Sequence, residues 1–175
     1  AYDGIVQLGL SEGQTLLITG IGGGVGVAAA QIARDAGIAV FGTASESKRA
    51  LVESLDAILI PYGDGVEQRV RDLLPEGVDA IYDLVGGDAL RAVAGLLKDR
   101  TRLITAGDPG TAAELGGVAV NRDRTSKTLD EVAALVAAGK LDPHVDDVIA
   151  FDDAAQAIAS VESGHAQGKV VIQID

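Results

Sequence analysis

Cysteine is absent from the sequence, and so is methionine. The lack of cysteine excludes disulfide bonds, thiolate zinc sites and cysteine nucleophiles, and it fits a cytoplasmic protein. No apolar run is long enough to cross a membrane and no signal peptide with a charged start is present, so no membrane partner is expected. Because even an initiator methionine is missing and the chain opens within a predicted helix, we expect a fragment or a processed product.

Basic residues are scarce as well. The 14 Lys and Arg residues stand against 26 Asp and Glu residues, which gives a net charge of −12. Binding to a phosphate backbone needs clustered Lys and Arg, so nucleic acid is not an expected partner. Any anionic ligand must therefore be bound by a local arrangement of residues and not by the overall charge of the chain. Hydrophobic residues, in contrast, make up 47% of the 175 residues, which predicts one globular domain with a substantial core.

Short apolar runs alternate with helical patterns along most of the chain. Five runs predict buried strands, at Thr15–Thr19, Ala39–Thr43, Ala57–Ile60, Ala80–Leu84 and Leu103–Ala106. They are nearly continuous in apolar residues, which is typical of parallel strands that are covered on both faces. Between them, apolar residues recur at helical spacings of three and four. This alternation predicts an α/β fold of the Rossmann type, with a doubly wound parallel sheet.

The pattern changes after Gly107. The rest of the chain predicts a strand, a helix, a strand, a helix and a last strand, at Gly117–Val120, Thr128–Ala138, Val148–Phe151, Asp153–Ser163 and the run GKVVIQID. Thr128 and Glu131 have the spacing of a capping box at the start of the first of these helices. A turn-rich link between the two helices suggests a boundary, with residues 1–140 as one domain and residues 141–175 as a C-terminal βαβ segment.

A glycine-rich turn joins the first predicted strand to the first long helix, in LLITGIGGGVGVAAAQIARDAG. The strict pattern G-x-G-x-x-G is absent because Val25 stands at its last glycine position, whereas Gly20, Gly23 and Gly26 form G-x-x-G-x-x-G. Glycine permits positive φ and lets backbone N–H groups approach a pyrophosphate, and the helix N-terminus adds partial positive charge. A strand before and a helix after are the context of a dinucleotide-binding turn.

The turn has two other interpretations. The glycines can simply allow close packing of strand and helix, without any ligand. A P-loop needs Lys and then Ser or Thr after its last glycine, but Val27 and Ala28 stand there, which argues against nucleotide hydrolysis. The context favours phosphate binding, and the candidate turn residues are Gly20, Gly22, Gly23, Gly24 and Gly26.

The end of the second predicted strand bears on the choice of dinucleotide. An NAD site usually has Asp or Glu there, bound to the ribose 2′-hydroxyl. The sequence VFGTASESKRA instead offers the small residues Thr43 and Ser45, followed by Lys48 and Arg49, which suit a 2′-phosphate. The alternative is that both basic residues are ordinary solvated helix residues. The pattern favours NADP(H).

Three stretches carry a family resemblance: GQTLLITGIGGGVGVAAAQIARDAGIAVFGTASESKRA, GVDAIYDLVGG and the C-terminal GKVVIQ. They are similar to medium-chain dehydrogenase/reductases, in particular to the zinc-free quinone oxidoreductase branch related to zeta-crystallin, nearly from end to end of the chain. The resemblance implies an NADPH-dependent oxidoreductase that transfers hydride to a small-molecule electrophile, a quinone or an activated alkene. It also implies a homodimer, for which Gly117–Val120 is the candidate edge strand.

The resemblance further implies roles for single residues. Under the pyrophosphate and the nicotinamide ribose it places Gly23, Gly24 and Val25. Around the 2′-phosphate it places Ser45, Lys48 or Arg49, and Tyr62. Along the cofactor, at the carboxyl ends of two strands, it places Val85, Gly86, Ala106 and Gly107. On the nicotinamide side it places, with weaker support, Asn121 and the Gly168–Lys169 turn.

Two departures from the family matter. The stretch VESLDAILIPY is shorter than its family counterpart, which leaves open whether Lys48 or Arg49 meets the 2′-phosphate. The family's N-terminal GroES-like catalytic domain is absent, so residues 1–140 would be the NADP(H)-binding domain and residues 141–175 would join the missing domain. Two alternatives remain: an enoyl-thioester reductase module of a fatty acid or polyketide assembly, and a non-catalytic NADP(H)-binding module.

Several patterns that look catalytic have simpler explanations. Ser11 matches G-x-S-x-G, but a predicted helix precedes it and a strand follows, the inverse of a nucleophile elbow. His144 lies among acidic residues, yet the chain lacks metal ligands at usual spacings, so no metal is expected. Asp83 could be a general base, but a buried carboxylate there is expected to accept hydrogen bonds, and Tyr82 to pack in the core. No catalytic residue is assigned.

Overall fold

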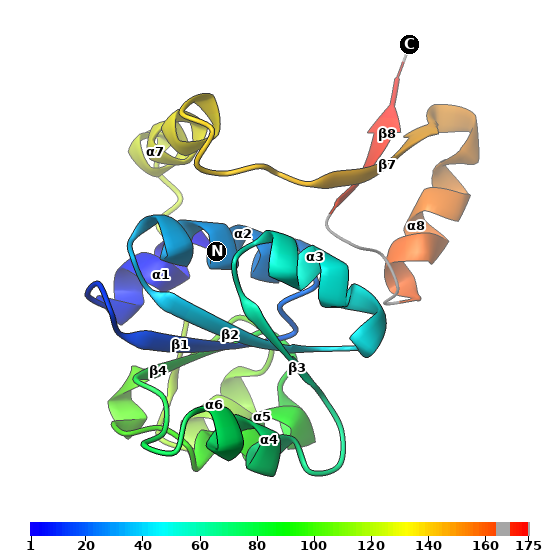
Figure 1. The fold of residues 1–175 in the computed structure, drawn as a ribbon. Helices are drawn as coiled ribbons and strands as arrows, with labels where there is room; N and C mark the ends of the chain where they lie inside the picture. The colour runs from blue at the N-terminus through cyan, green and yellow to red at the C-terminus, as the bar shows by residue number, and fades with distance from the viewer. Residues whose placement is uncertain (164–168, 175) are drawn as a thin grey trace.

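A six-stranded parallel sheet forms the centre of the computed structural model, which describes residues 1–163 and 169–174 (Figure 1). Its strands are β1 (Thr15–Thr19), β2 (Ala39–Ala44), β3 (Ile58–Pro61), β4 (Ala80–Asp83), β5 (Leu103–Thr105) and β6 (Val118–Ala119). Their order is β3-β2-β1-β4-β5-β6, and every neighbouring pair is parallel. The predicted Rossmann-type sheet is confirmed. The order reverses between β1 and β4, which creates a switch point at their carboxyl ends.

Helices cover both faces of this sheet (Figure 1). One face carries α1 (Tyr2–Leu8), α2 (Gly24–Asp35) and α3 (Arg49–Ser54), and the other carries α4 (Val66–Leu73), α5 (Gly87–Ala94) and α6 (Pro109–Glu114). Leu16 and Ile18 of β1 pack in the core cluster on the first face, while Leu17 packs in the cluster on the second. Since successive strand side chains point to opposite faces, double coverage explains why the strands are continuous apolar runs.

The helix α7 (Ser126–Ala137) begins earlier than the capping-box spacing indicates. Its N-cap is Thr125, whose hydroxyl accepts a hydrogen bond from the Thr128 N–H at 3.3 Å. The Thr128 hydroxyl donates instead to Asp123 at 3.0 Å, and Glu131 accepts from the Tyr2 hydroxyl at 3.0 Å. The predicted capping box is therefore wrong, because a suitable cap lies three residues before it.

The C-terminal segment is a separate βαβ unit, as predicted. It consists of β7 (Val145–Ala150), a 3-10 turn at Phe151–Asp153, α8 (Ala154–Glu162) and β8 (Lys169–Gln173). The strands β7 and β8 pair in parallel with each other and lie outside the two helix layers (Figure 1). The strand predicted at 148–151 is displaced toward the N-terminus: β7 begins at Val145 and ends at Ala150, because Phe151 already belongs to the 3-10 turn. No helix in the described ranges combines the length and apolarity needed to span a membrane.

The link before this unit is anchored to the main body. Leu141 is buried in the core cluster that includes α1 and α2. The side chain of Gln31 on α2 donates to the Asp142 carbonyl at 2.9 Å and accepts from the Asp142 N–H at 2.8 Å. Lys169 of β8 also reaches the body, since its Nζ donates to the Gly24 carbonyl at 2.9 Å. These contacts place the C-terminal unit beside the glycine turn.

Candidate functional site

A cavity of about 1090 Å³ opens at the carboxyl ends of the central strands, at the switch point. The residues that line it come from the glycine turn, from the end of β2 and the segment after it, from the segment after β3 with the start of α4 (Val66–Leu73), from the loop after β4 with α5, and from the C-cap of α8: Gly20, Gly23, Thr43, Ala44, Ser45, Ser47, Lys48, Tyr62, Gly63, Val66, Leu84, Val85, Asp88, Ala89, Ala92, Val93 and Ser163. Of the predicted site residues, Gly20, Gly23, Thr43, Ser45, Lys48, Tyr62 and Val85 are among them.

Gly20, Gly23 and Gly26 of the turn differ in how strictly the structure requires glycine at each position. Gly20 has a φ of 72°, a conformation that favours glycine, and a Cβ there would lie 2.9 Å from the Val85 side chain. A Cβ on Gly26 would lie 2.5 Å from the Ile21 carbonyl oxygen, so Gly26 allows the helix to approach the turn. A Cβ on Gly23 would meet only the Gly20 carbonyl oxygen, at 3.5 Å. Gly23 is thus the glycine that folding requires least.

The helix α2 presents its N-terminus at the cavity. Gly23 is both its N-cap and part of the cavity lining, and no side chain caps the helix. No acidic residue occupies its first turn. The first N–H groups of a helix lack intrahelical partners and carry partial positive charge, so this end of α2 suits an anion. The turn residues Gly22, Gly24, Val25 and Gly26 lie at this end without lining the cavity.

Two lysines flank the glycine turn. The Lys48 Nζ donates to the Gly22 carbonyl at 3.3 Å, and its side chain packs so closely that a Cβ on Gly22 would collide with it. Lys169 contacts the Gly24 carbonyl from the other side, as described above. The family resemblance places Lys169 on the nicotinamide side together with Gly168, which lies outside the described residues. Two cationic side chains thus contact backbone carbonyl groups of the turn in an otherwise acidic chain.

Arg49 is oriented differently from its neighbour. Its guanidinium binds Glu46 and Glu53, at positions i−3 and i+4, and it does not line the cavity. These carboxylates, Glu46 first, raise the pKa of Arg49, and the hydrogen bond from Arg49 lowers the pKa of Glu46. The geometry thus separates Lys48, which faces the cavity, from Arg49, which is held along its own helix.

Small hydroxyl groups surround Lys48. The Ser45 and Ser47 hydroxyls lie 2.9 Å apart at the cavity wall. Tyr62, just after β3, lines the same part and is 63% exposed. Thr43 contributes through its backbone, since its carbonyl accepts from the Gly20 N–H at 2.9 Å. No carboxylate ends β2, so this corner combines one cation with hydroxyl donors.

The loops after β4 and β5 pack tightly against each other. Val85 is 55% exposed and lines the cavity, whereas Gly86, Ala106 and Gly107 do not line it. A Cβ on Gly107 would lie 2.9 Å from the Leu84 carbonyl carbon, and one on Gly86 would collide with Asp108. Asp83, at the end of β4, is fully buried and accepts backbone hydrogen bonds, as expected of this carboxylate.

Asp108 joins these two loops at their surface. Its carboxylate accepts from the Thr111 hydroxyl at 2.6 Å and the Thr111 N–H at 3.0 Å, and so caps α6. The same carboxylate accepts from the Gly87 N–H at 3.1 Å. These hydrogen bonds, led by the Thr111 hydroxyl, lower the pKa of Asp108 from 3.8 to about 2. The carboxylate is therefore ionised throughout the neutral range.

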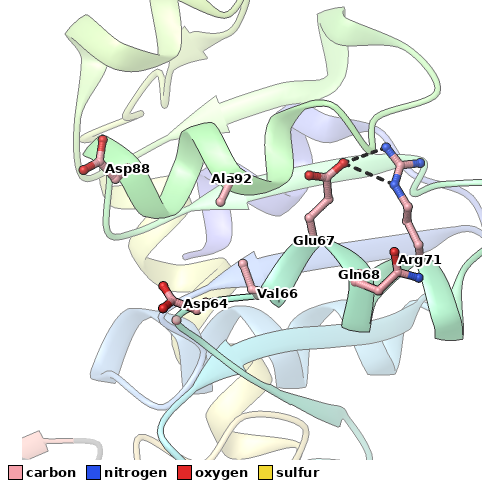
Figure 2. Close-up of a pocket in the computed structure, with 9 residues that line it drawn as sticks. Asp64, Val66, Glu67, Gln68, Arg71, Asp88 and Ala92 are labelled. Atoms are coloured by element: carbon pink, nitrogen blue, oxygen red, sulfur yellow. Dashed lines mark hydrogen bonds and ion pairs between the residues drawn. The ribbon is translucent and has the colours of Figure 1, made fainter.

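A smaller cavity of about 540 Å³ adjoins the first, between the N-terminal ends of α4 and α5 (Figure 2). Figure 2 shows Asp64 and Asp88 at one end of it and the pair of Glu67 and Arg71 at the other. The Arg71 guanidinium is bound to Glu67 at 2.8 Å. With its arginine paired and two carboxylates opposite, this cavity does not suit a phosphate.

The other residues considered from sequence lie away from the cavity. The exposed Ser11 sits in a turn between α1 and β1, and its N–H donates to the Gln14 side chain at 2.9 Å. The His144 N–H donates a hydrogen bond to the Asp142 carboxylate at 2.8 Å. Asn121 is exposed, and its N–H donates to Gln7 at 2.8 Å. Within residues 1–163 and 169–174, no three potential metal-ligating side chains gather.

Comparison with known proteins shows the family. A family profile described as zinc-binding dehydrogenase matches residues 55–172. The chain belongs to this family, and the resemblance to medium-chain dehydrogenase/reductases and their quinone oxidoreductases is confirmed. A quinone oxidoreductase structure from Coxiella burnetii is 25% identical over 99% of the chain and 57% of its own, with a TM-score of 0.84.

Two relatives illustrate the range of the family. The mitochondrial NAD(P)H oxidoreductase RTN4IP1 of Danio rerio is 32% identical over 94% of this chain and 50% of its own length. Erythronolide synthase EryA2 of Saccharopolyspora erythraea is 31% identical over 94% of this chain and 5% of its own length. The chain thus spans about half of the zebrafish relative and a small part of the synthase.

Proposed function

We propose that the chain is the NADP(H)-binding portion of an oxidoreductase that reduces quinones or activated alkenes. The observation that carries the proposal is the cavity at the switch point, where the uncapped N-terminus of α2 and the Lys48 side chain meet. Its volume of about 1090 Å³ suits a large ligand. The names of the zebrafish and Coxiella relatives describe oxidoreductases of this kind.

The residues present fit a dinucleotide with a 2′-phosphate. The glycine turn and the α2 N-terminus would hold the pyrophosphate through backbone N–H groups. At the end of β2, Lys48 with Ser45 and Ser47 would hold the 2′-phosphate, for which charge-assisted hydrogen bonds are suited. Arg49 takes no direct part, because Glu46 and Glu53 engage its guanidinium. The adenosine half would therefore lie over β2 and the nicotinamide half over β4 and β5.

This arrangement divides the catalytic work. The bound cofactor supplies the hydride, while the chain binds and orients it and shields it from water. Val85, half-exposed in the cavity wall, would pack against the nicotinamide side. A GroES-like domain would complete the binding site for the electrophile and supply any proton donor. The segment 141–175 would associate with that domain. The exposed apolar side chains of that segment, such as Val148 and Ile158, support such packing.

The proposal also covers the location of the protein in the cell and its assembly into a dimer. The cysteine-free, acidic chain would belong to a cytoplasmic protein that binds neither nucleic acid nor membrane. Two copies would pair through β6, a two-residue edge strand in which Val118 is 53% exposed. The match to erythronolide synthase favours a second candidate, an enoyl-thioester reductase module, which would use the same cofactor site with a different acceptor.

A comparison of two adjacent substitutions tests the cofactor proposal. Lys48→Ala removes the cation at the cavity, whereas Arg49→Ala removes one held by Glu46 and Glu53. In fluorescence titrations, the unaltered chain should bind NADPH more tightly than NADH. Lys48→Ala should weaken NADPH binding by about tenfold or more and leave NADH binding nearly unchanged. Arg49→Ala should change neither by more than about twofold.

The outcomes separate the candidates. Equal affinity of the unaltered chain for the two cofactors, or a larger effect from Arg49→Ala, would refute the 2′-phosphate site. A chain that binds NADPH but whose full-length parent transfers no hydride to quinones, enones or enoyl thioesters would be a non-catalytic binding module.

A further inference from the structure

One buried carboxylate connects three strands directly beneath the candidate site. Asp83 is fully buried at the carboxyl end of β4. Its Oδ1 accepts from the Thr19 hydroxyl at 2.6 Å, and its Oδ2 accepts from the Thr105 hydroxyl at 2.6 Å. Thr19 ends β1 and Thr105 ends β5, so the carboxylate bridges the strands on both sides of its own. We name Thr19, Asp83 and Thr105 the strand-end cluster.

The cluster also fixes the loops that leave these strands. The Asp83 Oδ1 accepts from the N–H groups of Val85 at 3.2 Å and Gly86 at 2.9 Å. Because each threonine donates its only hydroxyl proton to Asp83, its oxygen is left to accept backbone N–H groups. The Thr19 hydroxyl accepts from Leu84 at 3.0 Å.

The Thr105 hydroxyl likewise fixes the loop after β5 by accepting backbone hydrogen bonds. Its hydroxyl accepts from the N–H groups of Gly107 at 3.0 Å and Asp108 at 2.9 Å. The Ala106 N–H donates to the Asp83 carbonyl at 2.9 Å. A single carboxylate side chain thus orients backbone in two loops, because its oxygens accept from two threonine hydroxyls and two backbone N–H groups.

We propose that the strand-end cluster positions the nicotinamide half of the dinucleotide, with Asp83 as a positioning residue that acts through Val85 and the loop after β5. The inference rests on the proposed cofactor site. In this fold the end of β2 receives the adenosine half, so the loops after β4 and β5 meet the other end of the cofactor. Val85, which lines the cavity, follows Asp83 by two residues and donates to it directly.

The substitution Asp83→Asn tests this role without a change in volume. The substitution replaces one acceptor oxygen of Asp83 with an amide nitrogen, which is a donor. The threonine hydroxyl that donates to that oxygen must then turn and accept from the amide instead. If this is Thr105, its oxygen can no longer accept from both Gly107 and Asp108. Thr105→Val removes the same hydroxyl at similar size, and Thr105→Ser restores it.

A matched control lies at the opposite end of the same strands. Asp79, just before β4, accepts from both the N–H and the hydroxyl of Thr15, the first residue of β1, each at 2.8 Å. The Asp79 N–H donates back to the Thr15 hydroxyl at 3.0 Å. Asp79 thus combines a similar aspartate–threonine contact with an ion pair to Lys98 at 3.0 Å, at the amino ends of the strands and away from the cavity. Asp79→Asn therefore perturbs the sheet without touching the proposed site.

The test compares two probes in the 175-residue chain: NADPH, and 2′,5′-ADP, which carries only the adenosine half with its 2′-phosphate. Asp83→Asn and Thr105→Val should weaken NADPH binding by about tenfold and leave 2′,5′-ADP within about twofold of the unaltered chain. Thr105→Ser should restore NADPH binding, and Asp79→Asn should alter neither affinity.

Three results would overturn the inference. Equal losses for both probes would show that the cluster supports the whole fold, and an unchanged NADPH affinity in Asp83→Asn would show that the loops do not depend on it. A loss of NADPH affinity in Asp79→Asn equal to that in Asp83→Asn would show that sheet stability alone controls binding. Failure of the unaltered chain to bind either probe would instead refute the proposed cofactor site itself.

Discussion

Individual glycines in the turn show how one sequence pattern serves both folding and binding. A Cβ on Gly26 would lie 2.5 Å from the Ile21 carbonyl oxygen and 2.6 Å from the Ile21 Cα, both backbone atoms that cannot move aside easily. Gly23 has a φ of −91°, which any residue can adopt, and faces the cavity. The pattern G-x-x-G-x-x-G therefore contains one residue, Gly26, that the fold requires to be glycine and one, Gly23, that it does not.

This distinction predicts different outcomes for two substitutions. Gly26→Ala should lower the free energy of unfolding by about 1–3 kcal/mol, because it overpacks the contact between helix and turn. Gly23→Val should leave the chain folded but abolish NADPH binding, because its side chain would enter the cavity beside the α2 N-terminus. Thermal unfolding and fluorescence titration measure the two effects. Retained binding in folded Gly23→Val would show that the phosphate lies elsewhere.

Lys48 and Arg49 show what sequence can and cannot tell at this scale. The sequence marks both as candidates, because each follows β2 within reach of a 2′-phosphate. Glu46 and Glu53 stand at helical distances from Arg49, and that spacing was a usable signal that Arg49 pairs along its own helix. The contact of Lys169 with Gly24 spans 145 residues and left no such signal.

At the scale of elements, the site is built from strand ends and the loops that follow them. The central strands were predictable because both of their faces are covered, which makes each a continuous apolar run. Elements with one exposed face were predicted less well: β7 begins at Val145, three residues before the expected start, and α7 is capped by Thr125. The strand-end cluster joins residues of three strands, so only the folded sheet reveals it.

The short helix α6 (Pro109–Glu114) gives a pH-dependent prediction. Its N-cap Asp108 has a pKa lowered from 3.8 to about 2, so the cap stabilises the fold fully above pH 4 and loses its contribution as the pH falls toward 2. Asp108→Ala should therefore be less stable than the unaltered chain at neutral pH, by a difference that shrinks between pH 4 and pH 2. Asp108→Asn, which keeps a capping oxygen, should retain more of the stability.

Denaturant unfolding at a series of pH values measures this difference. If the stability gap between the unaltered chain and Asp108→Ala were constant from pH 7 to pH 2, the ionised carboxylate would not be the stabilising form. A gap that widened on acidification would contradict the direction of the pKa shift.

The molecule as a whole combines a large cavity at the strand ends with a C-terminal βαβ unit. The six-stranded sheet and its loops carry most of the cavity lining, while the β7–α8–β8 unit contacts the glycine turn through Lys169 and exposes apolar side chains. The chain spans 50% of the zebrafish relative and 57% of the Coxiella structure. We therefore expect cofactor binding and catalysis to be separable properties of this protein.

A turnover assay tests that separation. The 175-residue chain should bind NADPH yet oxidise it negligibly in the presence of a quinone, because the proposed function places the electrophile against a GroES-like domain. Stopped-flow absorbance of NADPH measures the rate. Rapid, quinone-dependent oxidation would show that the chain already contains a complete substrate site.

If NADPH binds in the cavity at the carboxyl ends of β1, β2 and β4, its addition should shift the backbone amide NMR signals of the residues there. We expect the largest shifts at Gly20, Gly23, Ser45 and Val85, with NADH giving weaker changes near Ser45. Shifts centred instead on the smaller cavity around Glu67, or no saturable shifts at all, would show that the dinucleotide does not bind at the strand ends.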